Sequence, residues 1–558
     1  MTTNTATWWR DAVIYQVYPR SFADGNGDGI GDLPGVISRL DYLRDLGVDA
    51  VWISPFYTSP QNDAGYDVAN YRDVDPLFGS LEDIDVLIKE AHARNLRIFM
   101  DIVPNHTSSE HPWWQEVLGS EPGSPAWDRY MIREGKGANN EEPPNNWRSV
   151  FHGRGWSRLT DADGNLTPYW FLHLFDTTQP DLNWSNPEVR EEFRNILRFW
   201  FDRGVDGFRI DVAHGLVKAP GLPDADNTAI KAAEAIGRAP ESPFWDQDGV
   251  HEIYREWREV ADSYDPPRVF CGETWVAEPE RLALYQRPDE LHTSFNFGYL
   301  TAGWDADAVR ASIDSTVEQH ARVNAPPTWV LSNHDVTRHR TRLAPGYVRR
   351  ERSAHPDLVR GLDRARAATL FTLALPGSAY LYQGEEFGLF EVFDLPYELR
   401  EDPIFIRSKG ADLGRDGCRV PIPWSGTEPS YGFGTGSASW LPQPSAWAEL
   451  SAAALTGVPD STLEFYRSAL ALRHTEPSLG EGPMTWRDLS GQALALERNG
   501  DNESKVLAVI NFGETSVELP AEWGTEVLLG SGEAFAQVTV DESTYLVIGP
   551  DTCVWLRV

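Results

Sequence analysis

Short apolar segments alternate with helical patterns along most of the 558-residue chain. Residues 13–18 form an apolar run of strand type. In residues 33–46 the apolar side chains recur at helical spacing, which predicts one helix with Pro34 at its start and Gly47 just past its end. Strand segments that lack strict polar–apolar alternation and are separated by helices imply a parallel sheet covered on both faces.

Eight segments of this strand type are predicted, at residues 13–18, 51–53, 97–103, 207–212, 269–274, 294–297, 328–332 and 379–382. Eight strands with intervening helices predict an α/β fold of the (β/α)8 barrel type. A doubly wound open sheet is the alternative, but the sequence has no glycine-rich phosphate loop to support a nucleotide-binding version.

Two changes of pattern divide the chain into domains. Residues 105–178 are rich in Pro, Gly, Asn and Trp without a clear helix, which predicts a lid or a small domain inserted after strand three. Beyond about residue 477 the apolar period becomes two, which predicts an antiparallel β-domain. We therefore expect barrel residues at 1–104, the inserted domain at 105–178, further barrel residues at 179–476 with an irregular insertion at about 390–449, and a C-terminal β-domain at 477–558.

The composition excludes several classes of partner. The 84 acidic against 49 basic residues leave a formal charge of −35, which repels nucleic acid and anionic membranes. No apolar run approaches the roughly 20 residues that a membrane helix needs. Three scattered cysteines indicate reduced thiols. We expect a soluble cytoplasmic protein, a monomer or small homo-oligomer, with no nucleic-acid or membrane partner.

Polar groups gather at the predicted ends of the barrel strands, where barrels of this type place their catalytic residues. Three carboxylates are expected to converge there with two histidines and an arginine: Asp211, Glu273, Asp335, His106, His334 and Arg209. An oxocarbenium-like transition state needs such groups, with one carboxylate attacking the anomeric carbon and a carboxylic acid protonating the leaving oxygen. Arg209 lies two residues before Asp211 on the same face, so its charge is expected to keep Asp211 ionised. A single strand-end Asp is more often a helix cap or a structural ion pair.

Four of these segments resemble the shared regions of the α-amylase superfamily, glycoside hydrolase family 13: residues 101–106, 207–211, 272–275 and 332–335. Residues 179–183 and 14–22 are similar to segments of its oligo-1,6-glucosidase and α-glucosidase branch. The resemblance implies that Asp211 is the nucleophile, Glu273 the acid/base and Asp335 the transition-state stabiliser. It also implies retention of anomeric configuration and a carboxyl separation of roughly 5 to 5.5 Å between Asp211 and Glu273.

The same resemblance implies further substrate contacts. Tyr66 would stack beneath the terminal glucose and Asp67 would hold its outer hydroxyls. Arg415 would bind substrate, with Arg419 as the alternative, although either could form a surface ion pair. Two aromatic side chains of the inserted domain are candidate pocket walls, with core packing as the alternative: Phe151 and Phe171.

Residues 24–32 offer oxygen ligands at every second position, which suits a structural Ca²⁺ site with Mg²⁺ as the alternative ion. The expected ligands are Asp24, Asn26, Asp28, the Ile30 carbonyl and Asp32. The loop resembles the calcium site of the same enzyme branch, but no Glu closes it in the EF-hand manner. A plain Gly/Asp turn is the alternative, with Asp32 capping the following helix.

These observations together predict an exo-acting, retaining α-glucosidase that removes glucose from short α-linked oligosaccharides, with transglucosylation as a side reaction. The inserted domain would close one side of a dead-ended pocket. Val212 resembles the residue of α-1,6-cleaving members, whereas residues 213–218 depart from their pattern, so we expect a maltose-type enzyme with broad linkage tolerance. The alternatives are an oligo-1,6-glucosidase and a trehalose or sucrose isomerase. A non-catalytic, transporter-associated homologue is disfavoured because all three carboxylates are kept.

Overall fold

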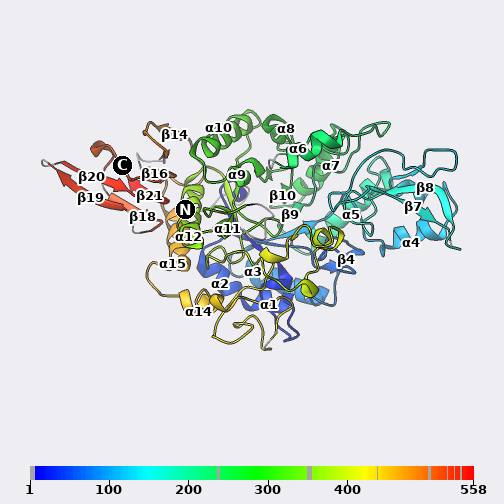
Figure 1. Ribbon diagram of the computed structural model, residues 1–558, viewed down its shortest axis with the longest axis horizontal. Helices are drawn as coiled ribbons and strands as arrows, with labels where there is room; N and C mark the ends of the chain where they lie inside the picture. The colour runs from blue at the N-terminus through cyan, green and yellow to red at the C-terminus, as the bar shows by residue number, and fades with distance from the viewer. Residues whose placement is uncertain are drawn as a thin grey trace.

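The structure is a computed structural model of the whole chain. It describes residues 7–161, 163–235, 239–348, 355–436, 438–500, 504–524, 526–532, 535–540 and 543–558. The barrel occupies the middle of the molecule, with the inserted domain at one end and the C-terminal β-domain at the other (Figure 1).

Within the described residues, eight parallel strands form the central sheet, in the order β11-β10-β9-β5-β2-β1-β13-β12. Their bounds are β1 (Val13–Val17), β2 (Ala50–Ile53), β5 (Arg97–Ile102), β9 (Gly207–Ile210), β10 (Val269–Gly272), β11 (Thr293–Ser294), β12 (Thr328–Val330) and β13 (Ser378–Tyr382). The order follows the chain round from β11 to β1 and continues to β13 and β12, so the eight strands form the predicted barrel, which is nearly closed between β11 and β12.

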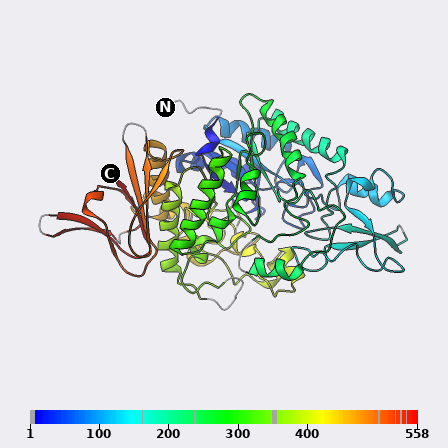
Figure 2. The same ribbon diagram turned by 90° about the horizontal axis from the view of Figure 1, so that it is seen from above.

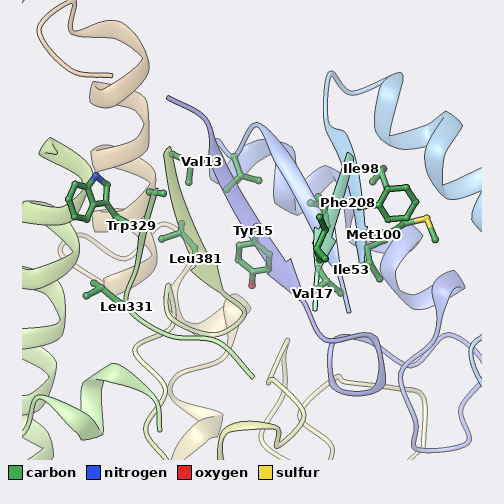
Figure 3. Close-up of a cluster of buried hydrophobic side chains, with 14 of the residues drawn as sticks. Val13, Tyr15, Val17, Ile53, Ile98, Met100, Phe208, Trp329, Leu331 and Leu381 are labelled. Carbon is green, nitrogen blue, oxygen red and sulfur yellow. The ribbon is translucent and has the colours of Figure 1, made fainter. Parts of the chain in front are cut away.

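Alternate residues of each strand face opposite sides of the barrel wall. Val13, Tyr15 and Val17 of β1 pack outward in the large core beneath the helices (Figure 3). Ile14 and Trp52 belong instead to a second core inside the barrel. The strands are therefore buried on both faces, which explains why their sequences lack polar–apolar alternation.

Helices cover the outside of the barrel and connect its strands: α1 (Leu33–Ser38), α2 (Leu40–Leu46), α3 (Leu81–His92), α5 (Pro187–Asp202), α6 (Asn227–Ala235), α7 (Val250–Asp262), α8 (Pro279–Leu284), α9 (Phe297–Thr301), α10 (Ala306–Arg322), α11 (His339–Arg342), α12 (Leu358–Ala374) and α15 (Thr462–Thr475). The prediction of one helix over residues 33–46 is wrong. Arg39 leaves helical geometry (φ −112°, ψ 6°) between α1 and α2, and the Ser38 hydroxyl donates to the Gly35 carbonyl at 2.6 Å. A serine that bonds to its own helix backbone competes with the helical pattern.

Within residues 105–178, the part that carries α4 (Pro112–Gly119), β7 (Trp156–Thr160) and β8 (Leu166–Leu172) protrudes from the barrel (Figure 1). Its antiparallel sheet has the strand order β6-β8-β7, where β6 spans Ile132–Glu134. The interpretation that this segment lacks a clear helix is wrong, because α4 spans Pro112–Gly119. The sequence did carry a start signal there, since Pro112 occupies the first helical position and the His111 side chain accepts the Trp113 N–H.

The C-terminal residues form two antiparallel sheets, as their period of two predicted, at the end opposite the inserted domain (Figure 2). One contains β14 (Met484–Arg487), β15 (Ala493–Asn499), β16 (Lys505–Asn511), β21 (Thr552–Arg557) and β18 (Glu526–Gly530); the other contains β17 (Val517–Glu518), β20 (Ser543–Ile548) and β19 (Phe535–Val540). The irregular insertion carries α13 (Pro403–Arg407), and α14 (Ala452–Leu455) follows it. In the described part of the chain, no helix is both long and apolar enough to cross a membrane.

Candidate active site

Two of the three predicted catalytic carboxylates stand directly after neighbouring barrel strands. Asp211 follows β9, and its N–H donates to the Ile102 carbonyl at 2.9 Å. Glu273 lies just beyond β10, and its N–H donates to the Ile210 carbonyl at 2.9 Å. These bonds continue the parallel ladder past the strand ends, so the rigid sheet places both side chains at the same mouth.

The Arg209 guanidinium holds three carboxylates together inside the barrel. Nη1 donates to Asp101 Oδ1 and to Asp211 Oδ1, each at 2.8 Å. Nη2 lies 2.6 Å from Glu273 Oε2 as an ion pair. The Arg209 side chain is fully buried, so the attraction is only weakly screened by water. One fixed cation therefore brings the predicted nucleophile and the predicted acid/base side by side.

Burial raises the pKa of Asp211 well above its usual value, and Arg209 opposes that rise only in part. Burial likewise raises the pKa of Asp101 to about 6. The expectation that Arg209 keeps Asp211 ionised thus overlooked a third carboxylate, Asp101, which shares the same single charge. Three carboxylates around one cation favour retention of a proton within the group.

Asp335 lies across the mouth, beyond the end of β12, and is held by two arginines. Arg415 Nη1 donates to its Oδ1 at 3.1 Å and Arg419 Nη2 donates to the same atom at 2.8 Å. Burial opposes ionisation of Asp335, yet its neighbours lower its pKa below the usual range. We attribute this to the arginines, because burial holds the pKa of His334 well below its usual value and so keeps that imidazole neutral.

The predicted aromatic and imidazole groups form a compact layer beside these carboxylates. The rings of Tyr66 and His334 stack with centroids 5.2 Å apart and planes 4° apart. The Tyr66 hydroxyl donates to Asp101 Oδ2 at 3.0 Å. Burial lowers the pKa of His106 to about 4, and its Nε2 donates to the Tyr66 carbonyl at 3.0 Å. Both histidines are therefore neutral near pH 7, which suits hydrogen bonding to sugar hydroxyls.

The structure distinguishes two aspartates in the loop before β4 (Asn70–Val74). Asp67 is fully buried, and its carboxylate accepts the Ser59 hydroxyl and the backbone N–H groups of Asn62 and Asp63 at 2.9 to 3.1 Å. Asp67 therefore braces the loop. Asp63 accepts Arg415 Nη2 at 2.8 Å and so joins the carboxylate site. Sequence reasoning missed Asp63, because no periodic pattern in the loop separates it from Asp67.

Both arginines considered from the sequence lie at the site. Arg415 donates to Asp63, Asp335 and Asp402, and therefore connects three carboxylates across the mouth. Arg419 donates through Nε to the His334 carbonyl at 2.9 Å and is deeply buried. Neither forms a surface ion pair.

The two predicted pocket aromatics have different surroundings. The Arg415 guanidinium carbon lies 5.0 Å from the centre of the Phe151 ring, so Phe151 reaches the site. Phe171 packs against Trp114, with ring centroids 4.9 Å apart, within the inserted domain. Phe175 was missed; its ring lies 5.2 Å from His106 and 5.5 Å from Phe151. Phe171 sits within β8, whereas Phe175 lies in the loop that follows.

Val212, directly after Asp211, adopts left-handed backbone geometry with φ 44°. A β-branched residue rarely occupies this region, so the backbone is strained here. In this conformation the Val212 N–H donates to Glu273 Oε2 at 3.1 Å. The strained peptide thus orients the predicted acid/base towards Asp211.

The oxygens of the predicted metal loop are engaged with the loop itself. The Asp24 carboxylate accepts the N–H groups of Gly27 and Gly29. The Asn26 side chain accepts the Asp28 N–H, and the Asp28 side chain accepts the Ile30 N–H. Asp32 caps α1 by accepting the Gly35 N–H at 2.6 Å, as its alternative interpretation proposed. Over the described ranges, no three His, Cys, Asp or Glu side chains come together as a metal-holding group. The oxygen donors suit a hard cation, but no converging acidic cluster supports the site.

Comparisons with known proteins extend over nearly the whole chain. The family model described as "Alpha amylase, catalytic domain" matches residues 16–482. A probable alpha-glucosidase from Rhizobium meliloti (strain 1021) is 38% identical over 529 residues, which cover 92% of this chain and 91% of that protein. An oligo-1,6-glucosidase from Parageobacillus thermoglucosidasius is 37% identical over 496 residues, covering 84% and 83%.

Among solved structures, the crystal structure of the alpha-glucosyl transfer enzyme XgtA matches with a TM-score of 0.84 and 34% sequence identity. This match covers 99% of both chains. The similarity therefore includes the inserted domain and the C-terminal β-domain as well as the barrel.

Proposed function

The chain belongs to the family of the α-amylase catalytic domain, and from this premise we propose that it is an exo-acting, retaining α-glucosidase. As a member of that family it is a glycoside hydrolase. The observation that carries the proposal is the pairing of Asp211 and Glu273 on one buried arginine, Arg209, with Asp335 across the mouth. Two carboxyls side by side are what the double-displacement mechanism requires.

In the first step, Glu273 in its acid form donates a proton to the glycosidic oxygen while Asp211 attacks the anomeric carbon. The bond to the leaving sugar breaks and an ester to Asp211 forms. Glu273 is better placed than Asp211 to meet the leaving group, since its side chain is 15% exposed and that of Asp211 only 9%.

In the second step, the Glu273 carboxylate takes a proton from water as the water oxygen attacks the same carbon. The ester breaks, glucose leaves and Asp211 is regenerated. Two inversions return the original anomeric configuration. Asp335, kept anionic by Arg415 and Arg419, stabilises the positive charge that develops on the sugar ring in both steps.

Action at the chain end is supported by the bridge that Arg415 makes between Asp63 and Asp335. We infer that a charged bridge across the site would stop a polymer from continuing past the sugar held there. The enzyme would therefore remove single glucose units from the non-reducing ends of short α-linked oligosaccharides. We propose a maltose-type preference with tolerance for α-1,6 links, since named relatives include both an alpha-glucosidase and an oligo-1,6-glucosidase.

The test is a time course of the products formed from maltose, isomaltose and sucrose, with an Asp211→Asn variant as control. Free glucose from maltose ahead of isomaltose supports the proposal, and isomaltose cleaved first makes the enzyme an oligo-1,6-glucosidase. Trehalose or a sucrose isomer without free glucose would assign it to the isomerases. Turnover that is unchanged in the Asp211→Asn variant would overturn the mechanism.

We also propose a structural Ca²⁺ ion, with Mg²⁺ as alternative, in the loop of residues 24–32. The support is the chemistry of its donors, which are Asp24, Asn26, Asp28, the Ile30 carbonyl and Asp32. The ion would brace the loop and would take no part in the reaction. Thermal unfolding after chelation tests this: an unchanged midpoint on adding back millimolar Ca²⁺ or Mg²⁺ contradicts the proposal.

The protein is further proposed to act in the cytoplasm as a monomer or small homo-oligomer. The three cysteines are buried and free, which suits a reducing compartment: Cys271, Cys418 and Cys553. Cell fractionation and light scattering of the purified protein test these two statements.

A further inference from the structure

Arg407, the last residue of α13, connects the irregular insertion to the inserted domain. Its Nη1 donates to Asp176 Oδ2 at 3.0 Å and its Nη2 donates to the His152 carbonyl at 2.6 Å. The side chains of Arg407 and Asp176 are only 19% and 15% exposed. We call Arg407, Asp176 and the His152 carbonyl the clasp.

The two sides of the clasp leave the barrel at separated strands. The inserted domain follows β5, and α13 follows β13. In the sheet order, β2 and β1 lie between these two strands. The clasp therefore spans part of the barrel mouth, on the side where Arg415 and Asp63 meet. It joins two segments that are far apart in the chain, since Arg407 and Asp176 are separated by 231 residues.

Each side of the clasp is attached to the carboxylate site. Asp402 caps α13 by accepting the Ile404 N–H, and it also accepts Arg415 Nε at 2.8 Å. On the other side, the Asp176 N–H donates to the Gln179 side chain, whose amide donates to Asp63 at 3.1 Å. Opening the clasp would thus loosen the surroundings of both ends of the Arg415–Asp63 pair.

A second contact accompanies the clasp at the same border. His152 Nε2 lies 3.9 Å from Asp412 Oδ2, and the neighbouring Phe151 ring lies beneath Arg415. Burial opposes ionisation of Asp176, but hydrogen bonds from Thr178 and Arg407 outweigh it and lower its pKa. The Arg407–Asp176 contact is therefore a true ion pair at neutral pH.

We propose that Arg407 is a specificity-determining residue, which closes the pocket through the clasp and sets how the glucosyl-enzyme divides between water and a sugar acceptor. This inference rests on the proposed function. In either outcome the ester bond between the anomeric carbon and Asp211 breaks, a new bond forms to the acceptor oxygen, and the acceptor proton passes to Glu273. The acceptor is water in hydrolysis and a sugar hydroxyl in transfer.

A closed clasp favours transfer for a simple reason. It retains the leaving sugar or a second substrate molecule beside the ester, and it limits the entry of water. Opening the clasp speeds release of the sugar and admits water, so the share of hydrolysis rises.

The experiment measures the ratio of transfer products to free glucose at one fixed maltose concentration. Arg407→Ala should lower this ratio about threefold to fivefold, the effect of losing a partly buried ion pair worth about 1 kcal/mol. Arg407→Lys, which keeps the charge, should recover part of it. Asp176→Asn should lower it less, and adding Asp176→Asn to Arg407→Ala should change nothing further. Arg322→Ala removes the exposed pair with Glu318 on α10 and serves as the matched control.

A salt titration of the unaltered protein gives a second readout that does not depend on any variant's folding. Added NaCl screens the ion pair, so the transfer ratio of the unaltered protein should fall while that of Arg407→Ala stays flat. Equal ratios in both proteins, together with equal salt responses, would overturn the inference while leaving the glucosidase proposal intact. Absence of glucose release from every α-glucoside by the unaltered protein would instead overturn the proposed function.

Discussion

Arg415 donates to Asp63 across the mouth of the site at 2.8 Å, while Asp67, four residues further along the same loop, is turned inward and bonds only with that loop. The two aspartates are only four residues apart but have different surroundings. One is joined to the carboxylate site and the other is joined to its own backbone. This contrast leads to the first prediction.

Asp63→Asn should lower kcat/KM for maltose by roughly 10- to 100-fold, because the charged contact with Arg415 at the carboxylate site is lost. Asp67→Asn keeps the shape of the loop but leaves the Asn62 or Asp63 N–H facing an amide group, so it should mainly lower the melting temperature. Steady-state kinetics and thermal unfolding of both variants check this. A larger catalytic loss in Asp67→Asn than in Asp63→Asn would contradict the assignment.

Phe175 and Phe171 form a second matched pair. Phe175→Ala should raise KM for maltose several-fold, since its ring borders His106 and Phe151 at the site. Phe171→Ala should leave KM almost unchanged and destabilise the protein by about 1 to 3 kcal/mol, because it removes a partly buried ring that packs against Trp114. Kinetics and urea denaturation separate the two effects, and exchanged phenotypes would show that the pocket wall has been misassigned.

Removing the Arg209 guanidinium, which contacts three carboxylates, should lower the stability of the folded protein. Arg209→Met leaves Asp101, Asp211 and Glu273 buried without a counter-ion, so the free energy of unfolding should fall by about 3 to 5 kcal/mol at pH 7. The variant's carboxyls, which lack the cation, should take up protons at higher pH than in the unaltered protein, where the pKa of Asp101 is about 6. The deficit should therefore shrink as the pH falls towards about 6 and level off below it, because protonated carboxyls need no cation.

Chemical denaturation of Arg209→Met and the unaltered protein between pH 4.5 and 7.5 measures this difference. Arg322→Met, at an exposed pair, should change stability by no more than about 1 kcal/mol at any pH. A deficit that is independent of pH would assign the loss to packing alone.

Glu385 lies beyond the end of β13, outside the proposed catalytic groups, and leads to a prediction of how stability depends on pH. Burial raises its pKa to about 8. The unfolded carboxyl titrates at about 4.3, so between these values the folded state binds the extra proton and stability falls as the pH rises. In Glu385→Gln the free energy of unfolding should fall less steeply with rising pH, by about 1.4 kcal/mol per pH unit from pH 5 to 8. Denaturation at several pH values checks the slope, with Glu259→Gln at an exposed position as control; parallel slopes would refute the prediction.

The sequence by itself determined the barrel and the strand ends at which the predicted catalytic carboxylates lie. Strand and helix periods are local properties, and a strand end places its next side chain at the mouth whatever the loops do. Asp211 and Glu273 could therefore be placed from the pattern around them, and the motifs that contain them led to the family. The charge balance around Arg209 could not be derived in the same way, because Asp101 joins it only when β5 pairs with β9.

Only the tertiary structure decided which loop residues face the site. In the loop before β4, Asp63 rather than Asp67 meets Arg415. Phe175, in the loop after β8, meets His106, whereas Phe171 within β8 packs against Trp114. The contact of Arg407 with Asp176 belongs to the same class, since it joins two loops from separated strands. Loops have no repeating period, so the direction of each side chain depends on hydrogen bonds and packing with distant segments, which no local pattern in the chain records.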